Sequence, residues 1–240
     1  VVVGQFVGSQ ALAAVSSTGS LVNLIVSVFS GLSLGTSVAV AQGYGAGKKE
    51  DASRAVHTSI AVALIGGLAV ALLGLFLSRP MLVLMDSPDD VLDLSALYLK
   101  IYFLGAPFNM LYNFGSAVLR AIGDTKRPLY FLTVSGLINV ALNLFLVIVC
   151  GMGVAGVAIA TVASQVVSCV LVLFCLIRSN GFIRLRPREI RIYKDKLLEI
   201  LKIGLPAGIQ GSIFSISNVI IQSSINGFGS AAMAGNGASS

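Results

Sequence analysis

Amide and hydroxyl side chains recur at helical spacing within stretches of the sequence that carry no charge. Asn139 and Asn143 stand four residues apart, and Thr161 and Gln165 repeat that spacing in a later part of the same stretch, so each pair lies on one face of a helix. Neutral oxygens of this kind coordinate Na⁺ or hydrogen-bond a polar solute, but they do not exchange a proton near neutral pH. The four residues therefore predict a site for a cation or a polar substrate.

Further polar stripes extend the pattern along other apolar stretches. Polar side chains within lipid are costly unless they face protein or water, which favours a solvated interior that Asn23 and Asn113 help to line. The plainer interpretation is that these side chains only hydrogen-bond neighbouring helices together, and the sequence leaves both open. The stripes comprise Ser16, Ser20, Asn23, Ser27 and Ser30; Asn109, Asn113 and Ser116; and Ser215, Asn218 and Gln222.

Motifs for catalysis are weak throughout the sequence, and we expect a non-enzymatic protein without a bound cofactor. The Gly-rich segment 43–49 resembles a phosphate-binding loop, but that motif requires Gly at position 42 and Ser or Thr at position 49, where Gln42 and Lys49 stand. His57, the only histidine, has no carboxylate at helical spacing and is expected at an interface. The cysteines lie singly in apolar stretches and predict no metal or redox site: Cys150, Cys169 and Cys175.

Composition places these residues in a membrane protein. The 240 residues are 56% hydrophobic and only 11% charged, with a mean hydropathy of +0.93, whereas soluble domains carry roughly a quarter charged residues. The fold class is therefore all-α polytopic, which excludes soluble enzymes, nucleic-acid-binding proteins and disordered chains. About 20 apolar residues cross a bilayer as a helix, and runs close to or above that length carry no charge at residues 1–47, 55–78, 101–119, 128–177 and 203–240.

Helix breakers divide these runs into predicted spans. We expect the second span to stop at Arg79-Pro80 and the third to kink at Pro107. Residues 1–3 are expected to end an earlier helix. Residues 193–202 place apolar residues at helical spacing between charges, which predicts either an amphipathic helix on the membrane surface or a solvated linker helix. The predicted spans are residues 11–42, 53–78, 91–121, 128–149, 154–177 and 204–226.

Basic residues are concentrated in alternate connections between the spans. The segments 44–54, 120–127 and 178–202 hold 14 of the 16 Lys and Arg residues. The intervening connections hold an acidic cluster and an uncharged glycine turn. Because cytoplasmic loops of membrane proteins carry the excess of basic residues, the pattern predicts a multi-pass protein of the cell (inner) membrane with its basic connections in the cytoplasm.

A short internal repeat indicates a larger architecture. Residues 7–14 (VGSQALAA) align with residues 228–235 (FGSAAMAG) at four of eight positions, and six predicted spans separate them, so both copies share one orientation. The sequence then predicts one six-helix lobe of a twelve-helix, two-lobe protein. We expect residues 1–180 to form this lobe without most of its first helix, 181–203 a cytoplasmic basic linker with an amphipathic helix, and 204–240 the first helix of the second lobe.

Several segments of the sequence resemble those of the multidrug and toxic compound extrusion (MATE) family, in its prokaryotic branch. The segments are VGQFVGSQALAAV at residues 3–15, AQGYGAGKKEDA at 41–52, LRAIGDTKRP at 119–128 and GLP at 204–206. They are similar to the family's first outer loop, its first and second inner loops and the start of its seventh helix. The resemblance spans the whole chain and implies an exporter with two lobes around a central cleft.

The resemblance implies secondary active efflux, in which the lobes rock between outward- and inward-open states. Small cationic or amphipathic compounds leave against inflowing Na⁺ or H⁺. The family's ion site in the first lobe uses a carboxylate on the first helix, an Asn and an Asp four residues apart on the fifth, and a Thr on the sixth. Asn139, Asn143 and Thr161 match the last three positions, with Asn143 in place of the Asp. The implied partners are the bilayer and the substrate, with no nucleic acid, and the full-length protein is expected to be monomeric.

The sequence leaves two alternatives open. A lipid-linked oligosaccharide flippase of the same superfamily would be expected to carry cationic residues in its cavity, and the polar stripes contain none. A non-transporting membrane scaffold would have no need of polar stripes on five helices. Transport assays on the full-length protein separate both from a multidrug exporter.

Overall fold

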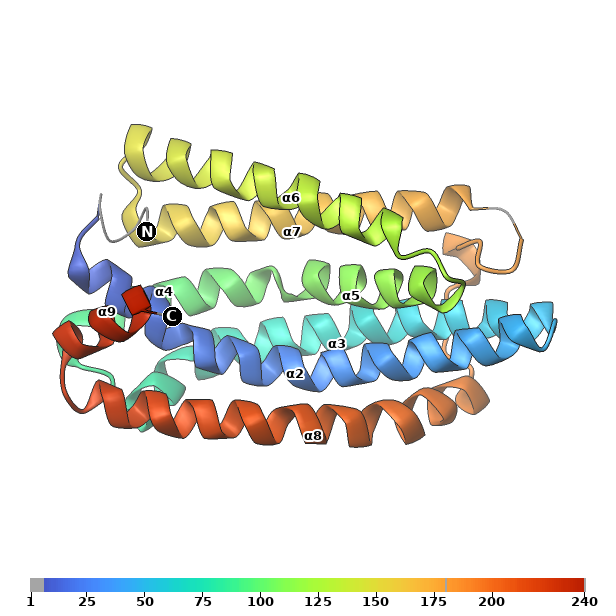
Figure 1. Ribbon diagram of the computed structural model, residues 1–240, viewed down its shortest axis with the longest axis horizontal. Coiled ribbons are helices and arrows are strands. Elements are labelled where there is room, and N and C mark those ends of the chain that lie inside the picture. Colours follow the sequence, from blue (N-terminus) through green and yellow to red (C-terminus); the bar gives the residue numbers. More distant parts are fainter. Residues whose placement is uncertain (1–6, 180, 240) are drawn as a thin grey trace.

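In the computed structural model, which describes residues 7–179 and 181–239, the chain folds into a bundle of long helices (Figure 1). Among the described residues five helices are long and apolar enough to cross a membrane, and the bent pair Asp89–Leu104 and Ala106–Ala121 passes the same test of length and hydropathy when taken together. This confirms the all-α polytopic class; the helix end predicted at residues 1–3 lies outside the described residues. The elements are α2 (Ser9–Gly45), α3 (Lys49–Leu84), α4 (Asp89–Leu104), α5 (Ala106–Ala121), α6 (Lys126–Leu144), the π-helical η1 (Phe145–Val149), α7 (Gly153–Arg178), the 3-10 turn η2 (Pro187–Glu189), α8 (Lys194–Asn226) and α9 (Ser230–Ser239).

The long helices lie side by side along one axis of the molecule (Figure 1). α6 and α7 form an antiparallel pair at one edge, α8 packs along α2 at the other, and α3 and α5 lie between them. We call the two ends of the bundle the basic end and the acidic end, after the basic connections and the aspartate cluster that they hold. The connections 46–48, 122–125 and 181–193 meet at the basic end, and 85–88, 150–152 and 227–229 at the acidic end.

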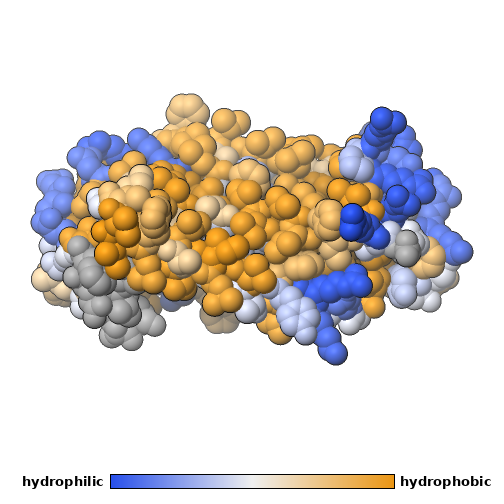
Figure 2. All heavy atoms as spheres, turned by 90° about the horizontal axis from the view of Figure 1, so that it is seen from above, coloured by the Kyte–Doolittle hydropathy of each residue, from blue (hydrophilic) through white to orange (hydrophobic). Residues whose placement is uncertain are grey.

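The outer surface of the bundle is apolar between these ends. Figure 2 shows a hydrophobic belt over the middle of the molecule and hydrophilic residues gathered at both ends. The surface exposes large side chains that a water-soluble protein would bury, such as Phe76 at 78% exposure and Phe214 at 71%. The chain is therefore a multi-pass membrane protein whose apolar belt faces lipid.

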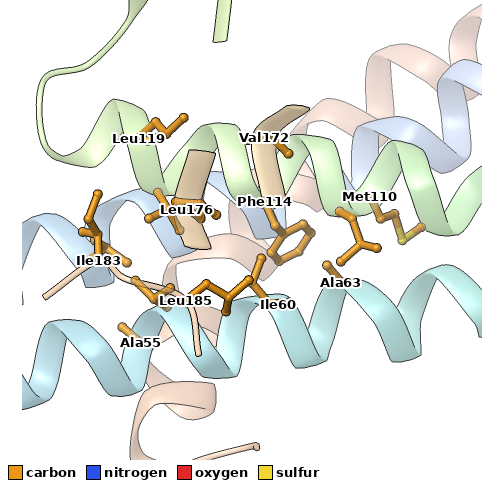
Figure 3. Packing of buried hydrophobic residues seen from close by; sticks show 14 of the residues in the cluster. Ala55, Ile60, Ala63, Met110, Phe114, Leu119, Val172, Leu176, Ile183 and Leu185 are labelled. Atoms are coloured by element: carbon orange, nitrogen blue, oxygen red, sulfur yellow. The ribbon is translucent and has the colours of Figure 1, made fainter. Parts of the chain in front are cut away.

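The main core joins α3, α5 and α7 and reaches into the connection 181–193. Phe114 of α5 is fully buried in one cluster with Ile60 of α3 and Leu176 of α7 (Figure 3). Ile183 and Leu185 belong to the same cluster, and the Leu185 N–H donates to the carbonyl oxygen of Leu176 at 3.0 Å. This connection is therefore packed onto the bundle as part of the fold.

Glycine brings α2 and α8 into backbone contact. Gly31 and Gly35 on α2, and Gly204 and Gly208 on α8, are each spaced four residues apart, the small-residue pattern that lets membrane helices approach closely. A Cβ atom added at Gly208 would lie 2.7 Å from the Val28 carbonyl oxygen. The helices therefore have no room for side chains at this crossing.

The predicted break at Pro80 and the predicted kink at Pro107 have different outcomes. As predicted, the chain bends near Pro107: α4 and α5 meet at 48°, with the break at Gly105 and the proline in the first turn of α5. The predicted stop at Arg79-Pro80 is wrong, because α3 continues through Pro80 to Leu84. The missing N–H of Pro80 removes one backbone hydrogen bond, and α3 continues for only four more residues, so little of the helix lies beyond the proline.

The helix of the final span begins earlier than the predicted span. α8 runs without interruption from Lys194 through Pro206 to Asn226, so residues 194–202 are helical as expected, but they continue into the span and do not form a separate helix. Ile200, Gly204 and Gly208 are buried where the helix packs on α2. This packing supports a continuous helix across the proline, because neighbouring helices compensate for proline in membrane spans.

The two copies of the predicted repeat adopt the same local structure. Gly8 has a φ of 111° and α2 begins at the following Ser9; Gly229 has a φ of 90° and α9 begins at Ser230. Such positive φ angles favour glycine. The shared Gly-Ser therefore marks a helix start in both copies, which supports a repeat of parallel orientation.

Candidate functional site

A cleft of about 590 Å³ opens between α5, α6 and α7. We call it the polar cleft, because three of the predicted polar stripes meet on its walls. Its lining comprises Asn109, Tyr112, Asn113 and Arg120 of α5, Leu132, Ser135, Gly136 and Asn139 of α6, Thr161, Ser164, Gln165 and Ser168 of α7, and Val26 of α2.

Three of the predicted residues of α6 and α7, Asn139, Asn143 and Thr161, are linked by one chain of hydrogen bonds. Nδ2 of Asn143 donates to Oδ1 of Asn139 at 2.9 Å, and Nδ2 of Asn139 donates to Oγ of Ser164 across to α7 at 3.4 Å. Oγ of Ser164 in turn donates to the backbone oxygen of Thr161 at 2.7 Å. The structure thus brings Asn139, Asn143 and Thr161 together at the α6–α7 contact, with Asn143 one turn beyond the lining residues toward the acidic end.

Two buried amide oxygens at this site lack a donor among the described residues. They are Oδ1 of Asn143 and Oε1 of Gln165. A buried acceptor without a partner costs about 1–3 kcal/mol relative to a satisfied one. Both are carbonyl oxygens, which suit a hard cation such as Na⁺ or the donor of a polar solute. The cleft, through Gln165, and the adjoining turn of α6, through Asn143, therefore hold acceptor oxygens that the fold itself does not use.

Asn113 reaches the cleft from α5. Its Nδ2 donates to the backbone oxygen of Asn109 at 2.9 Å, and Nδ2 of Asn109 donates to the hydroxyl of Tyr102 at 3.4 Å. The hydroxyl of Tyr112 donates to the carbonyl oxygen of Pro128 at 2.9 Å and so ties α5 to the start of α6. This wall is therefore fixed by hydrogen bonds that connect α5 to Tyr102 of α4 and to the backbone of α6.

Asn23 and the stripe of α8 are not brought to the cleft. Asn23 is exposed on α2, outside the cleft lining, and the neighbouring Ser27 pairs with Ser215 of α8, their Oγ atoms 2.7 Å apart. At the acidic end, Nε2 of Gln222 donates to Oδ1 of Asn226 at 3.0 Å. For Ser27, Ser215 and Gln222 the plainer interpretation holds: the serine pair joins α2 to α8, and Oε1 of Gln222 accepts from Nδ2 of Asn236 on α9 at 3.5 Å.

Arg120 is a lining residue that the sequence analysis did not select. It is exposed near the end of α5 and is the charged member of the described cleft lining. Its position continues the stripe of Asn109, Asn113 and Ser116 at the same spacing of three and four. This spacing could have identified Arg120 as a lining residue, but its positive charge and its place at the end of the span also fit the basic connection 120–127.

His57 has a structural role that its expected interfacial position did not predict. The side chain is buried, with Nδ1 at 2.7 Å from the carbonyl oxygen of Ser53 and Nε2 accepting the backbone N–H of Arg186 at 3.2 Å. One helical position later, Oγ1 of Thr58 accepts the backbone N–H of Tyr193 at 3.2 Å. Through these two hydrogen bonds His57 and Thr58 hold the connection 181–193 against α3.

A bundle of membrane-spanning helices with a polar cleft inside it is the architecture of a helical membrane transporter. The family model described as MatE matches residues 1–145, and the chain belongs to this family. It is 35% identical to the probable multidrug resistance protein YoeA of Bacillus subtilis (strain 168), over 98% of this chain and 52% of that protein. It is 33% identical to the probable multidrug resistance protein YpnP of the same organism, over 98% of this chain and 53% of that protein.

Solved structures agree with this family. An inward-facing conformation of a multidrug resistance MATE family transporter of the MOP superfamily matches with a TM-score of 0.89 and 25% identity, over 97% of this chain and 53% of that chain. The chain thus spans about half the length of the relatives and of the structure it matches. It has the fold of one half of a MATE transporter.

Proposed function

We propose that the intact protein exports small cationic or amphipathic compounds across the cell membrane, and that this chain forms most of its first lobe. The observation that carries the proposal is the polar cleft, where neutral amide and hydroxyl groups from three helices gather inside a membrane-spanning bundle. A purely structural bundle would close such a space with apolar or small side chains. The two Bacillus subtilis relatives, both named as probable multidrug resistance proteins, support the same activity.

The proposed mechanism is antiport by alternating access. Two lobes rock around the cleft, which opens first to one side of the membrane and then to the other. The first lobe offers neutral oxygens such as Oδ1 of Asn143 and Oε1 of Gln165, which coordinate Na⁺ but cannot carry a proton. Residues 128–177 contain no Asp or Glu. Proton coupling would therefore need a carboxylate elsewhere in the intact protein.

The test is transport by the purified intact protein in proteoliposomes. Export of an ethidium-like cation is followed with an inward Na⁺ gradient, with an inward H⁺ gradient and with neither. We expect export under at least one gradient and its loss when an ionophore collapses that gradient. Export that no gradient accelerates contradicts the proposal.

A lipid-linked oligosaccharide flippase is the second candidate, and one observation favours it. Arg120 lines the polar cleft, and a guanidinium group binds phosphate oxygens through two parallel hydrogen bonds. A flippase cavity would be expected to hold several cationic residues, and the described lining holds no second one. This favours the exporter. The variant Arg120→Gln separates the two, because it should abolish flipping of a lipid-linked sugar but leave the export of a monovalent cation intact.

The orientation, location and oligomeric state belong to the same proposal. The excess of basic residues supports a cytoplasmic basic end in the inner membrane. We propose a monomer in which residues 1–180 belong to the first lobe. The linker that follows it would end at Lys194, where α8 begins, and α8 would be the first helix of the second lobe.

A further inference from the structure

A second cavity lies at the basic end, apart from the polar cleft. It has a volume of about 530 Å³ and lies between the first turns of α3 and the connection 181–193. We call it the basic groove, because cationic side chains dominate the charges on its walls. These charged residues are Lys49, Glu50, Arg54, Arg184, Arg186, Glu189 and Arg191.

The lining of the basic groove carries more positive than negative groups. Five cationic groups face two carboxylates, which leaves a net charge of +3. Glu50 pairs with Arg54 at 2.5 Å, and Glu189 pairs with Arg186 at 3.0 Å. The remaining three cations, Lys49, Arg184 and Arg191, have no ion-pair partner in the described part of the chain.

Aromatic rings position some of these cations. The Nζ atom of Lys49 lies 5.4 Å from the ring centre of Phe182, and the guanidinium carbon of Arg191 lies 4.6 Å from that of Tyr193. A ring face attracts a cation and leaves the remaining N–H donors of the side chain available. The cations are therefore placed without using up their hydrogen-bonding capacity.

The wall of the basic groove is fixed in place by the core. Ile183 and Leu185 are buried beside the groove-lining residues. His57 and Thr58 of α3 accept the backbone N–H groups of Arg186 and Tyr193. Like charges on a mobile loop would move apart, but here the fold holds them together around one cavity. A site with this arrangement is preorganised for an anion.

We propose that the basic groove binds the phosphate of an anionic membrane phospholipid. Guanidinium groups match phosphate geometry, and basic pockets beside membrane helices hold anionic lipid headgroups. A lipid is favoured over a soluble anion because the groove begins at the first turns of a membrane span. In addition, Tyr193 is the type of aromatic residue found at membrane interfaces. The inference does not depend on which compound the protein transports.

The test compares lipid binding by the intact protein and its variants in detergent micelles, measured by native mass spectrometry. The probes are dioleoylphosphatidylglycerol, dioleoylphosphatidylcholine and inorganic phosphate. The groove variant is Arg184→Gln with Arg191→Gln, and the matched control is Lys194→Gln with Lys202→Gln, two exposed residues of α8 outside the groove lining. Each variant removes two positive charges from the same end of the bundle.

We expect phosphatidylglycerol to bind the wild type at least tenfold more tightly than phosphatidylcholine. The groove variant should lose about 25-fold in affinity, since each basic residue contributes about fivefold near a membrane surface, and the control should stay within twofold. Equal losses in both double variants would overturn the proposal, as would displacement of the lipid by equimolar inorganic phosphate. Should the groove variant fail to fold, Lys49→Gln on α3 replaces it, with an expected loss of about fivefold.

Discussion

Gly31 on α2 and Gly208 on α8 meet backbone against backbone where the two helices cross, and neither position has room for a side chain. Ser27 and Ser215 extend the contact along the same pair of helices, with their Oγ atoms 2.7 Å apart. The contact joins the part of the chain before the connection 181–193 to the part after it. Its closeness rests on the absence of Cβ atoms.

We predict that Gly31→Ala destabilises the intact protein by about 1–3 kcal/mol, because the added methyl group meets backbone atoms of α8 that cannot move aside. The matched control is Gly19→Ala, the same change in the same helix at a position with open space. There the better helix propensity of alanine should leave stability unchanged or raise it by up to about 1 kcal/mol. Thermal unfolding in detergent measures both. Equal effects of the two substitutions would contradict the close crossing.

The anchoring of the connection 181–193 gives a second prediction. His57→Leu removes the acceptor of the backbone N–H of Arg186, and the loss of such a hydrogen bond costs about 0.5–1.5 kcal/mol. Local opening of the connection should rise about tenfold for each 1.4 kcal/mol lost. We therefore expect trypsin to cleave after Arg184 at least several-fold faster than in the wild type, whereas the bond after Arg186 resists trypsin because Pro187 follows it.

Ser59→Ala is the control for this experiment. Ser59 is buried in the same turn of α3, but its Oγ donates only within the helix, to the carbonyl oxygen of Ala55 at 2.6 Å. Its removal should leave the cleavage rate unchanged. Cleavage of the His57→Leu variant at the wild-type rate would show that the histidine does not hold the connection.

Most of the fold could be predicted from the placement of charge. Uncharged runs identify the spans, because lipid leaves few places for a charged side chain, and the meeting of α5, α6 and α7 follows from their polar stripes. The errors occur where a local signal competes with packing. Pro80 and Pro206 indicate helix boundaries, yet both lie within continuous helices. Sequence spacing alone does not show which neighbouring helix will stabilise a proline.

The candidate site could be predicted only in part for a related reason. Asn139, Asn143 and Thr161 lie on short segments joined by a tight turn, so their proximity follows from local spacing. Asn23 lies on a helix of 37 residues, which is roughly 55 Å long. The polar residues along such a long helix face different neighbouring elements, so they do not all line one site. The basic groove could not be predicted from the sequence, because its walls come from α3 and from a connection more than a hundred residues later. Only tertiary packing brings these two segments together.

The membrane orientation is a third prediction. The exposed residues Lys48 and Arg188 lie at the basic end, and Asp89 and Gly151 lie at the acidic end. After the exposed Cys150 is replaced by serine, single cysteines at these four positions should react with an impermeant reagent from opposite sides of the membrane. We expect the basic-end positions, with Arg127 as a further site, to be labelled only from the cytoplasmic side. Labelling of positions 48 and 89 from the same side would contradict the alternating topology.

Asn143 is the residue on which the proposed ion site depends. Its Nδ2 is engaged with Oδ1 of Asn139 at 2.9 Å, while its own Oδ1 is buried without a donor among the described residues. A side chain that only joined the two helices would not need to bury an unused acceptor. The oxygen is therefore the atom to remove.

We predict that Asn143→Leu abolishes ion-driven efflux by the intact protein while its membrane yield and unfolding temperature stay near wild type, because leucine fills the same space without the oxygen. Asn143→Asp should retain transport, with a new loss of Na⁺-driven efflux at low pH, where protonation removes the negative charge that attracts the cation. Asn218→Leu, at an exposed position of α8 outside the cleft lining, is the matched control and should transport normally. Efflux assays in proteoliposomes across a pH series measure all three variants. If Asn143→Leu transports like the wild type, the asparagine pair serves only to hold α6 and α7 together.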